Sequence, residues 1–202
     1  KYWKFFVIFW SVVLVGIIGV FVFFWLISAG KLGFMPTFEE LENPNNRFAS
    51  EVYFADGPIM NRYFEKENRK YIEYREIPQS VIDALIATED VRFYDHSGVD
   101  VRGLFRVAKG LLTANTSAGG GSTISQQLAK MLFPRESDLN VFELAIRKFR
   151  EWVIAVRLEK SYTKEEILTM YLNKYDFLNL AVGISSAADI YFQVPLDSLK
   201  VE

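Results

Sequence analysis

Hydrophobic residues are unevenly distributed along the chain, and the longest apolar run lies near its amino end. Residues 5–27 contain no charged side chain and are interrupted only by Ser11, Gly16 and Gly19. A helix of that length would extend about 34 Å, enough to cross a bilayer core of about 30 Å. The apolar core of a secretory signal is shorter, and a buried core helix would have a polar face. The pattern therefore predicts a retained transmembrane helix over residues 1–28.

The charges that flank this run indicate its orientation. Lys1 and Lys4 precede it, and Lys31 follows it. Because basic residues are enriched on the cytoplasmic side of membrane helices, this bias predicts a cytoplasmic amino end. The rest of the chain would then lie outside the cytoplasm.

Residues 29–75 have the pattern of a linker followed by short strands. The first part is rich in Gly, Pro and Asn, which favours a loop. An Asp-Gly pair then separates two runs rich in aromatic and β-branched residues, 51–54 and 59–64, which is typical of a β-hairpin. A third short strand is expected near residues 70–74.

From Pro78 onward the apolar residues recur with the helical period of 3.6, so the rest of the fold is expected to be mainly α. Two pairs, Ser80 with Asp83 and Thr163 with Glu166, have the spacing of capping boxes. The predicted helices run from Ser80 to about Thr88, from Asp100 through Leu112, from Ser122 to Phe133, from either Asp138 or Asn140 to about Lys160, from Thr163 to Asn173, and from about Gly183 to Tyr191.

Charge and composition narrow the classes of function. The formal net charge is −2 and there is no cysteine. A nucleic-acid-binding protein would carry a basic excess, so no nucleic-acid partner is expected. His96 is the only histidine, which leaves no His or Cys cluster of the kind that binds zinc.

Glu89 is the first candidate for chemistry. It lies at the predicted carboxyl end of the helix that begins at Ser80, where the helix dipole disfavours an ionised carboxylate. Desolvation by Phe93 and Tyr94 would act in the same direction, and both effects would make the carboxylate a stronger base. On composition alone, a solvated Glu89-Asp90 pair that ends a helix is the more common interpretation.

A glycine run at residues 119–121 opens the second candidate segment. Ser122, Gln126 and Lys130 are four residues apart and therefore share one helical face. Free N–H groups at the start of such a helix can bind an anion, although the segment lacks the Gly-Lys-Ser/Thr of a P-loop. The alternative is an ordinary amphipathic helix capped by Thr123.

Residues 147–151 form the third candidate segment. Arg147 and Glu151 are spaced as a helical ion pair, which is worth about 0.2–0.5 kcal/mol. The apolar residues 152–156 follow at once, so these charges enter an apolar helix. Buried charges need partners or a function.

Together these segments resemble the peptidoglycan glycosyltransferases, the family of the monofunctional transglycosylases and of the amino-terminal half of class A penicillin-binding proteins. The resemblance covers about residues 77–202. Five motifs carry it in the family's order: Glu-Asp-x-x-Phe-x-x-His-x-Gly-x-Asp at Glu89, Gly-Gly-Ser-Thr-Ile-Ser-Gln-Gln-Leu-Ala-Lys at Gly120, Arg-Lys-x-x-Glu at Arg147, Lys-x-x-Ile-Leu-x-x-Tyr-Leu-Asn at Lys164, and Gly-Ile-x-x-Ala-Ala-x-x-Tyr-Phe at Gly183.

The resemblance implies a mainly α, lysozyme-like glycosyltransferase lobe with a small membrane-proximal jaw that contains the β-hairpin, preceded by one transmembrane helix. The chain would divide into an anchor at residues 1–28, a linker and jaw at 29–75, and a glycosyltransferase domain at 76–202 that continues beyond the carboxyl end. The implied location is the bacterial plasma membrane, as a single-pass protein with its catalytic domain outside the cytoplasm.

The resemblance also implies the reaction, which is polymerisation of lipid II into β-1,4-linked glycan with inversion and release of undecaprenyl pyrophosphate. Glu89 would be the general base and Glu151 a second essential carboxylate. Cations would meet the charge of the leaving group. The expected substrate-binding residues are Asp90, Arg92, Phe93, Arg106, Ser122, Gln126, Gln127, Lys130, Arg147 and Lys148.

The expected ligands and partners follow from that reaction. No organic cofactor and no protein metal site are expected, although a divalent cation, Mg or Mn, would assist the pyrophosphate. The partners would be lipid II, the growing glycan strand, membrane lipid and other cell-wall synthesis proteins. Met131 and Leu178 depart from the family pattern, which usually has Asn and Gly at these positions.

Two other functions compete with this interpretation. A lysozyme-like hydrolase would share the helical lobe and a catalytic Glu, but it usually needs a second carboxylate to place water. A membrane-anchored scaffold would keep the fold without the chemistry. The basic residues favour a phosphate leaving group and therefore a synthase.

Overall fold

Helices form most of the part of the chain that the computed structural model describes, as predicted. That part comprises residues 2–37, 50–53, 59–63, 70–113, 120–132 and 139–199. The α-helices are α1 (Trp3–Ser28), α3 (Gln79–Glu89), α4 (Val101–Leu112), α5 (Ile124–Leu132), α6 (Val141–Ser161), α7 (Lys164–Lys174) and α8 (Ile184–Ala187). Shorter helical turns are η1 (Tyr74–Glu76), η2 (Phe93–Asp95), the π-helical η4 (Ala188–Phe192) and η5 (Leu196–Ser198).

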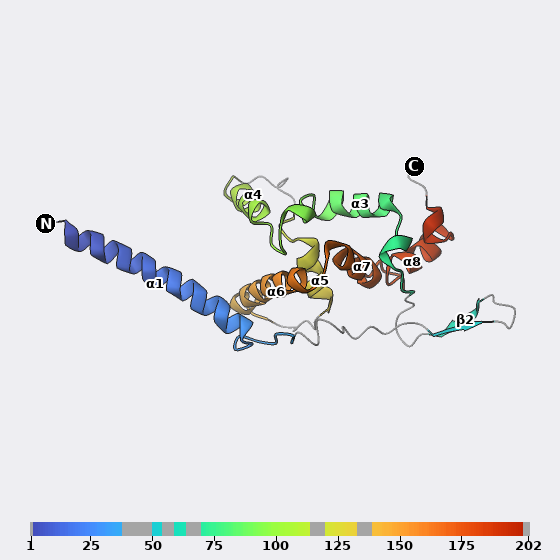
Figure 1. Cartoon of the computed structure of the whole chain (residues 1–202), viewed down its shortest axis with the longest axis horizontal. Coiled ribbons are helices and arrows are strands. Elements are labelled where there is room, and N and C mark those ends of the chain that lie inside the picture. The colour runs from blue at the N-terminus through green and yellow to red at the C-terminus, as the bar shows by residue number, and fades with distance from the viewer. Residues whose placement is uncertain are drawn as a thin grey trace.

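The predicted apolar anchor is a single long helix, α1. It projects from the rest of the molecule (Figure 1). Nearly all of its large apolar side chains are exposed, and Ile27 near its end is buried. Its length and composition are sufficient to cross a membrane. A helix that is apolar on all sides and not covered by protein is stable in lipid, which fits a membrane anchor.

The end of α1 packs against α6. The rings of Phe23 and Phe24 meet the ring of Phe149 edge to face, with centroids 5.3 and 5.8 Å apart. The guanidinium of Arg157 donates to the carbonyl and hydroxyl oxygens of Ser28, both at 2.8 Å. The anchor is therefore joined to the long helix that also carries Glu151.

The core surrounds α5, which lies between α6 and α7 (Figure 1). Ile124 and Leu128 of α5, Leu158 of α6 and Leu168 of α7 are all fully buried. The apolar positions of α5 recur on one face of the helix, so one short helix can serve as the centre of the lobe.

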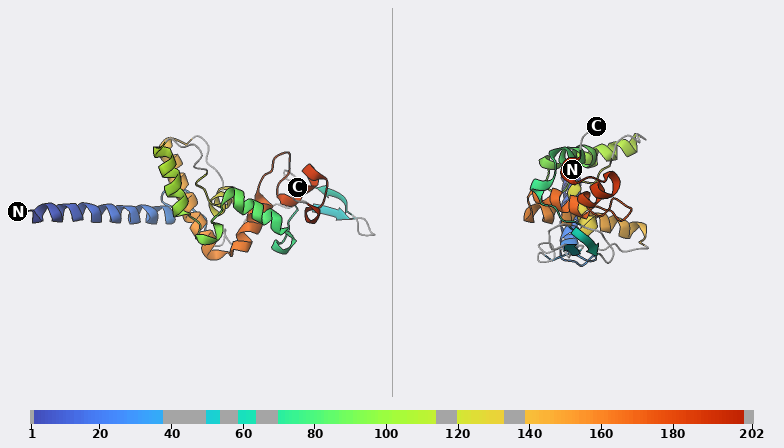
Figure 2. Two further views of the ribbon diagram at one scale, coloured as in Figure 1. Left: turned by 90° about the horizontal axis from the view of Figure 1, so that it is seen from above. Right: turned by 90° about the vertical axis from the view of Figure 1, so that its right-hand side faces the viewer.

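The predicted hairpin is confirmed. Strands β1 (Ser50–Tyr53) and β2 (Ile59–Tyr63) pair antiparallel, with an irregularity in register next to Tyr53. Both strands lie at the end of the molecule away from α1 (Figure 2), and their distance from a membrane stays a prediction. Twelve residues separate the described segment around α1 from Ser50, and an extended chain of that length can cover about 40 Å.

The third predicted strand, near residues 70–74, is wrong. The backbone N–H of Ile72 donates to Oδ1 of Asn173 at 2.9 Å, and Nδ2 of Asn173 donates to the carbonyl of Ile72 at 2.8 Å. An amide side chain on α7 thus takes the place of a neighbouring strand, and the chain enters the turn η1.

The capping box predicted at Ser80 is also wrong. Helix α3 begins one residue earlier, at Gln79, directly after Pro78. The ring of Pro78 has no oxygen that could accept a capping hydrogen bond. The side-chain amide of Gln79 donates to Asp83 at 2.8 Å, so Asp83 is used within the helix. Pro78 disfavours helical backbone in the residue before it and so sets the start.

The other predicted caps are present. Asn140 caps α6 and accepts from the N–H of Glu143 at 3.0 Å, which settles the alternative in its favour. Asp138 lies outside the described residues. Thr163 caps α7, and its capping box with Glu166 is complete, as predicted.

The departure at Leu178 falls on an unusual stretch of backbone. Leu178, Asn179 and Leu180 all have positive φ angles, of 70°, 49° and 67°. This left-handed region costs a non-glycine residue about 1–2 kcal/mol, and glycine adopts it freely. A glycine at position 178, which the resemblance leads us to expect, would adopt this backbone without that cost.

Candidate active site

Glu89 is the last residue of α3 and is exposed where two cavities of opposite character meet. One is polar, has a volume of about 300 Å³ and is lined by Thr88, Glu89, Asp90, Arg92, Asp100, Arg106 and residues 120–123, among others. The other is a larger groove of about 1060 Å³, lined mostly by apolar and aromatic side chains. A carboxylate at this junction can contact groups bound in either cavity.

Two arginines supply positive charge to the polar cavity. Arg92 forms an ion pair with Asp100, while Arg106 extends from α4 and is exposed. The hydrogen bond that Arg92 donates to Asp100 raises the pKa of Arg92, so this guanidinium stays charged. Partial burial raises the pKa of Asp100, but hydrogen bonds from Arg92 and from the backbone of Gly103 outweigh it and hold the pKa below its usual range. Arg92 is therefore a fixed cation.

Lys148 on α6 does not line this cavity itself but contacts Ser122, which does, and together with Glu151 it forms what we call the cationic wall. Its ammonium donates to Oγ of Ser122 at 3.0 Å and to Glu151 at 2.8 Å. Ser122 lines the polar cavity, so the three side chains connect α6 to that cavity. Glu151 is paired with Lys148 rather than with Arg147, the partner that simple helical spacing predicts. The carboxylate of Glu151 therefore orients the ammonium of Lys148.

Gln127 on α5 holds the Glu89 carboxylate. Its Nε2 donates to Oε2 of Glu89 at 2.7 Å, and its Oε1 accepts from the hydroxyl of Tyr171 at 3.1 Å. Burial raises the pKa of Tyr171, and the negative charge of Glu89 raises it further. Sequence reasoning did not select Tyr171, because no local pattern shows that a residue on α7 reaches α5.

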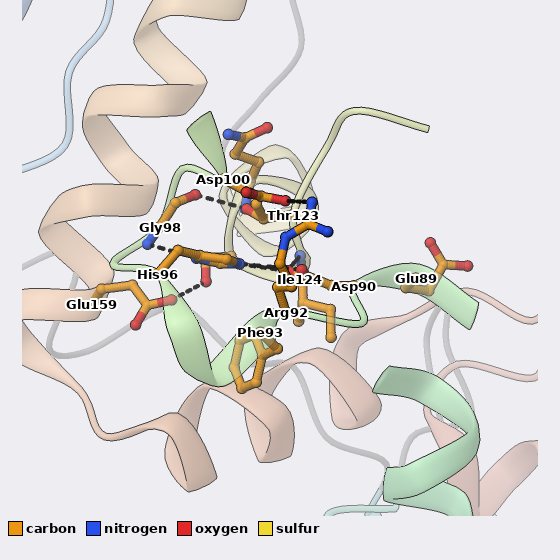
Figure 3. Close-up of polar contacts among 12 residues, drawn as sticks. Glu89, Asp90, Arg92, Phe93, His96, Gly98, Asp100, Thr123, Ile124 and Glu159 are labelled. Carbon is orange, nitrogen blue, oxygen red and sulfur yellow. Dashed lines mark hydrogen bonds and ion pairs between the residues drawn. The ribbon is translucent and has the colours of Figure 1, made fainter. Parts of the chain in front are cut away.

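Asp90 belongs to a buried network behind the site rather than to an open binding surface (Figure 3). Its carboxylate accepts from Nε2 of His96 at 2.9 Å and from the backbone N–H of Ile124 at 3.1 Å. Nδ1 of His96 accepts from the N–H of Gly98, so the ring hydrogen is on Nε2. Although Asp90 borders the polar cavity, its oxygens tie the turn after Glu89 to the start of α5.

Phe93, expected to shape the cleft, is fully buried in the core. The ammonium of Lys164 lies 4.2 Å from the centre of its ring and donates to the carbonyls of Phe93 and His96. Figure 3 shows the carboxylate of Glu89 pointing away from this ring. The predicted desolvation of Glu89 by Phe93 is therefore not found.

The remaining predicted site residues lie outside the two cavities. Gln126 is 1% exposed, and its amide atoms have no hydrogen-bond partner among the described residues. Lys130 is exposed and Arg147 half-buried, and neither lines the polar cavity or the groove. Of the predicted cations, the structure thus brings Arg92, Arg106 and Lys148 to the polar cavity or its wall.

The apolar groove extends from Glu89 between α3 and the carboxyl-terminal turns. Its lining includes the aromatic side chains of Tyr171, Tyr175, Phe177 and Phe192. Tyr175 stacks on Tyr171, and its ring meets that of Phe177 edge to face. Such walls contact flat or apolar faces of a ligand more readily than charged groups.

A protein metal centre is not visible in the described part of the chain. No group of three or more His, Cys, Asp or Glu side chains there could hold a metal ion. Lys148 already binds one oxygen of Glu151, and Arg92 binds one oxygen of Asp100. The donor set therefore fits a cation only if the ligand supplies most of the oxygens.

Comparison with known proteins shows which family the chain is similar to. The family described as Transglycosylase matches residues 56–202. The chain is 38% identical over 167 residues to penicillin-binding protein 1A of Escherichia coli, covering 83% of this chain and 19% of that protein. It is 37% identical to penicillin-binding protein 1A of Pseudomonas aeruginosa over 167 residues, covering 83% of this chain and 20% of the relative.

A third relative gives the same picture. Penicillin-binding protein 1A of Haemophilus influenzae is 37% identical over 176 residues, which is 87% of this chain and 19% of the relative. The chain thus spans about a fifth of the length of the curated relatives it matches. The similarity includes the segments that carry Glu89, Lys148 and Glu151.

Proposed function

Because this chain belongs to the transglycosylase family of peptidoglycan glycosyltransferases, we propose that it polymerises lipid II into β-1,4-linked glycan and releases undecaprenyl pyrophosphate. The observation that carries this proposal is the position of Glu89, between a cavity with fixed cations and a groove with aromatic walls. The two cavities suit the two unlike parts of a lipid-linked sugar, its diphosphate and its rings.

Glu89 acts as the general base in this proposal. The acceptor hydroxyl oxygen attacks the anomeric carbon of the donor from the face opposite the diphosphate, which inverts that carbon. The bond from the carbon to the diphosphate oxygen breaks, its electron pair leaves with the diphosphate, and Glu89 takes the hydroxyl proton. An exposed carboxylate at the meeting point of the cavities can reach that proton.

The polar cavity and its wall receive the diphosphates. Arg92 is fixed by Asp100, and Lys148 is fixed by Glu151 and Ser122, so both charges are in place before negative charge develops. Cations that need not move stabilise a transition state more than mobile ones do. Glu151 is then a positioning residue for Lys148. Lys130 and Arg147 are weaker candidates because, among the described residues, neither lines the cavity nor donates a hydrogen bond to a residue that does, as Lys148 does to Ser122.

The groove holds the sugar rings of the growing strand. Its aromatic side chains offer flat surfaces next to Glu89, where the new bond forms.

A divalent Mg or Mn ion would act at the polar cavity as a charge partner of the diphosphate. Glu151 is the residue that would hold it, with most ligand oxygens coming from the diphosphate and water.

The anchor concentrates the reaction at the membrane surface. Helix α1 spans the bacterial plasma membrane in this proposal, with its amino end in the cytoplasm and the lobe outside. Donor and acceptor are both membrane lipids, so a tethered enzyme meets them at high effective concentration. The contact of Phe149 and Arg157 with the end of α1 supports a fixed height of the site above the membrane.

The test is a product assay with the full chain in lipid vesicles and labelled lipid II. The wild-type chain should form glycan polymer, Glu89→Gln should form none above about 1% of that rate, and the exposed control Glu165→Gln should match the wild type. Release of sugars from preformed glycan would identify a hydrolase instead. Polymer formation by neither the wild-type chain nor the control would leave a scaffold as the better account.

A further inference from the structure

Glu89 is connected to the core by two consecutive hydrogen bonds. Gln127 donates to Oε2 of Glu89 at 2.7 Å, and Tyr171 donates to Oε1 of Gln127 at 3.1 Å. The three residues come from three different helices, α3, α5 and α7. An exposed carboxylate is thereby tied to a phenol that is 2% exposed.

The two hydrogen-bond partners of Gln127, Glu89 and Tyr171, fix the orientation of its side-chain amide. An ionised carboxylate only accepts hydrogen bonds, so it selects the NH₂ end of the amide. The hydroxyl of Tyr171 donates to the carbonyl end, which selects the same orientation. Without the hydroxyl, the amide loses its second restraint and can rotate.

Tyr171 is well placed to remain a donor. Burial raises the pKa of its hydroxyl, and the negative charge of Glu89 raises it further, so the phenol stays protonated near neutral pH. Its ring stacks on Tyr175, with centroids 5.4 Å apart and planes at 27°, which limits its movement. Tyr171, the first donor of these two hydrogen bonds, is therefore held in place.

The bond from Gln127 distinguishes the two oxygens of Glu89. Oε2 is occupied, whereas Oε1 has no hydrogen-bond partner in the part of the chain that the structure describes. Glu89 borders both cavities, so a hydroxyl group bound there meets a carboxylate with one oxygen still open. The proton would then arrive at Oε1.

We propose that Tyr171 is a positioning residue that acts through Gln127 to hold Glu89 with Oε2 occupied and Oε1 presented to the acceptor hydroxyl. The inference rests on the proposed function, in which Glu89 is the base. Tyr171 does not touch the reacting atoms in this account. Its loss should therefore lower kcat while leaving KM nearly unchanged.

Tyr171→Phe is the direct variant, because it removes the hydroxyl and keeps the ring in the core. We expect kcat for lipid II polymerisation to fall about 5- to 50-fold, the usual range for losing a well-placed hydrogen bond, with KM within about twofold. Wild-type kcat in a folded Tyr171→Phe protein would overturn the proposal. A rise in KM with unchanged kcat would do so as well.

A double-mutant cycle tests whether Tyr171 acts through Gln127. If it does, adding Tyr171→Phe to Gln127→Met should lower kcat by less than about twofold, because the link is already broken. Independent roles would instead multiply the two single effects, and that result would overturn the proposal. The cycle is measured in the same vesicles and at the same saturating lipid II.

Tyr191→Phe is the matched control. It loses a hydroxyl hydrogen bond of 2.6 Å to the carbonyl of Phe177 but has no bond to Gln127 or Glu89. We expect wild-type kcat and wild-type KM from this control. If Glu89→Gln abolishes polymerisation and Tyr171→Phe changes neither quantity, the positioning role alone fails. If Glu89→Gln polymerises normally, the proposed function fails and this inference fails with it.

Discussion

The two cavities beside Glu89 differ in size and in charge. The polar cavity is small, and its cations are held by carboxylates, Arg92 by Asp100 and Lys148 by Glu151. The groove is more than three times larger and is lined mainly by aromatic and aliphatic side chains. Fixed charges suit a step in which charge develops, and broad apolar walls suit a ligand that moves along them.

This contrast predicts different kinetic defects on the two sides. Substitutions in the cationic wall should lower the rate of bond formation, since they remove charge that the transition state needs. Substitutions in the groove should weaken binding of the strand and shorten the products, with little effect on the first bond. If both cavities had the same role, substitutions in either one would produce the same kind of kinetic defect.

The largest effect is expected from Lys148→Met, which removes the wall's ammonium and keeps most of the side-chain volume. Loss of a charge that stabilises a developing anion typically lowers kcat about 100- to 1000-fold. The measurement is the initial rate of polymerisation at saturating lipid II.

Lys160→Met is the control, since Lys160 is exposed at the far end of the same helix and should retain the wild-type rate. A Lys148→Met protein within threefold of the wild type would remove the cationic wall from the account. The contrast between the two cavities would then lose its chemical basis.

A smaller effect is expected from Phe192→Ala in the groove. Phe192 is 65% exposed, so its loss should not disturb the core. One aromatic contact is worth about 0.5–1.5 kcal/mol, which predicts a 2- to 10-fold rise in KM for the growing strand and shorter products on a sizing gel.

Phe142→Ala is the matched control, because Phe142 is 72% exposed on the first turn of α6 and does not line the groove. Wild-type strand length is expected from this variant. Equal shortening by both variants would show that exposed aromatic residues matter in general, and the groove would have no special role.

Local patterns in the sequence predicted much of the fold. The apolar run defined α1, the 3.6 period located α5 and α7 to within two residues, and the Thr163 box fixed where α7 begins. The pairing of β1 with β2 followed from the Asp-Gly pair between two runs of strand-forming residues. Each of these features depends on residues that are close together in the chain.

Apart from the capping box at Ser80, which failed for the local reason that Pro78 starts the helix earlier, the failures involve contacts between distant residues. Asn173 binds the backbone of Ile72 and prevents a third strand, and no pattern near residue 72 indicates this. In the site, motif resemblance selected Asp90, but only the structure places its carboxylate in a bond to the start of α5. Tyr171 was missed for the same reason, since its partner Gln127 comes from another helix.

The smallest effect is expected at Leu178, next to the groove residue Phe177. Leu178→Gly relieves the left-handed backbone but loosens the unfolded chain, so the net gain should be about 0.5–1 kcal/mol. In a chain of this size, that corresponds to a rise in Tm of about 1–4 °C. Thermal unfolding followed by circular dichroism measures it.

The opposite sign is expected for Leu112→Gly, because Leu112 is exposed at the end of α4, where glycine weakens a helix. A lower Tm for both variants would mean that position 178 carries no backbone strain.

The most direct test of the central claim is kcat for Glu89→Gln at saturating lipid II, measured against Glu165→Gln in the same vesicles. Glutamine keeps the shape of the side chain and its place beside Gln127 but cannot accept the hydroxyl proton. The account predicts a loss of about 100-fold or more in kcat, with KM within about threefold. A Glu89→Gln protein that polymerises within tenfold of the control would contradict it.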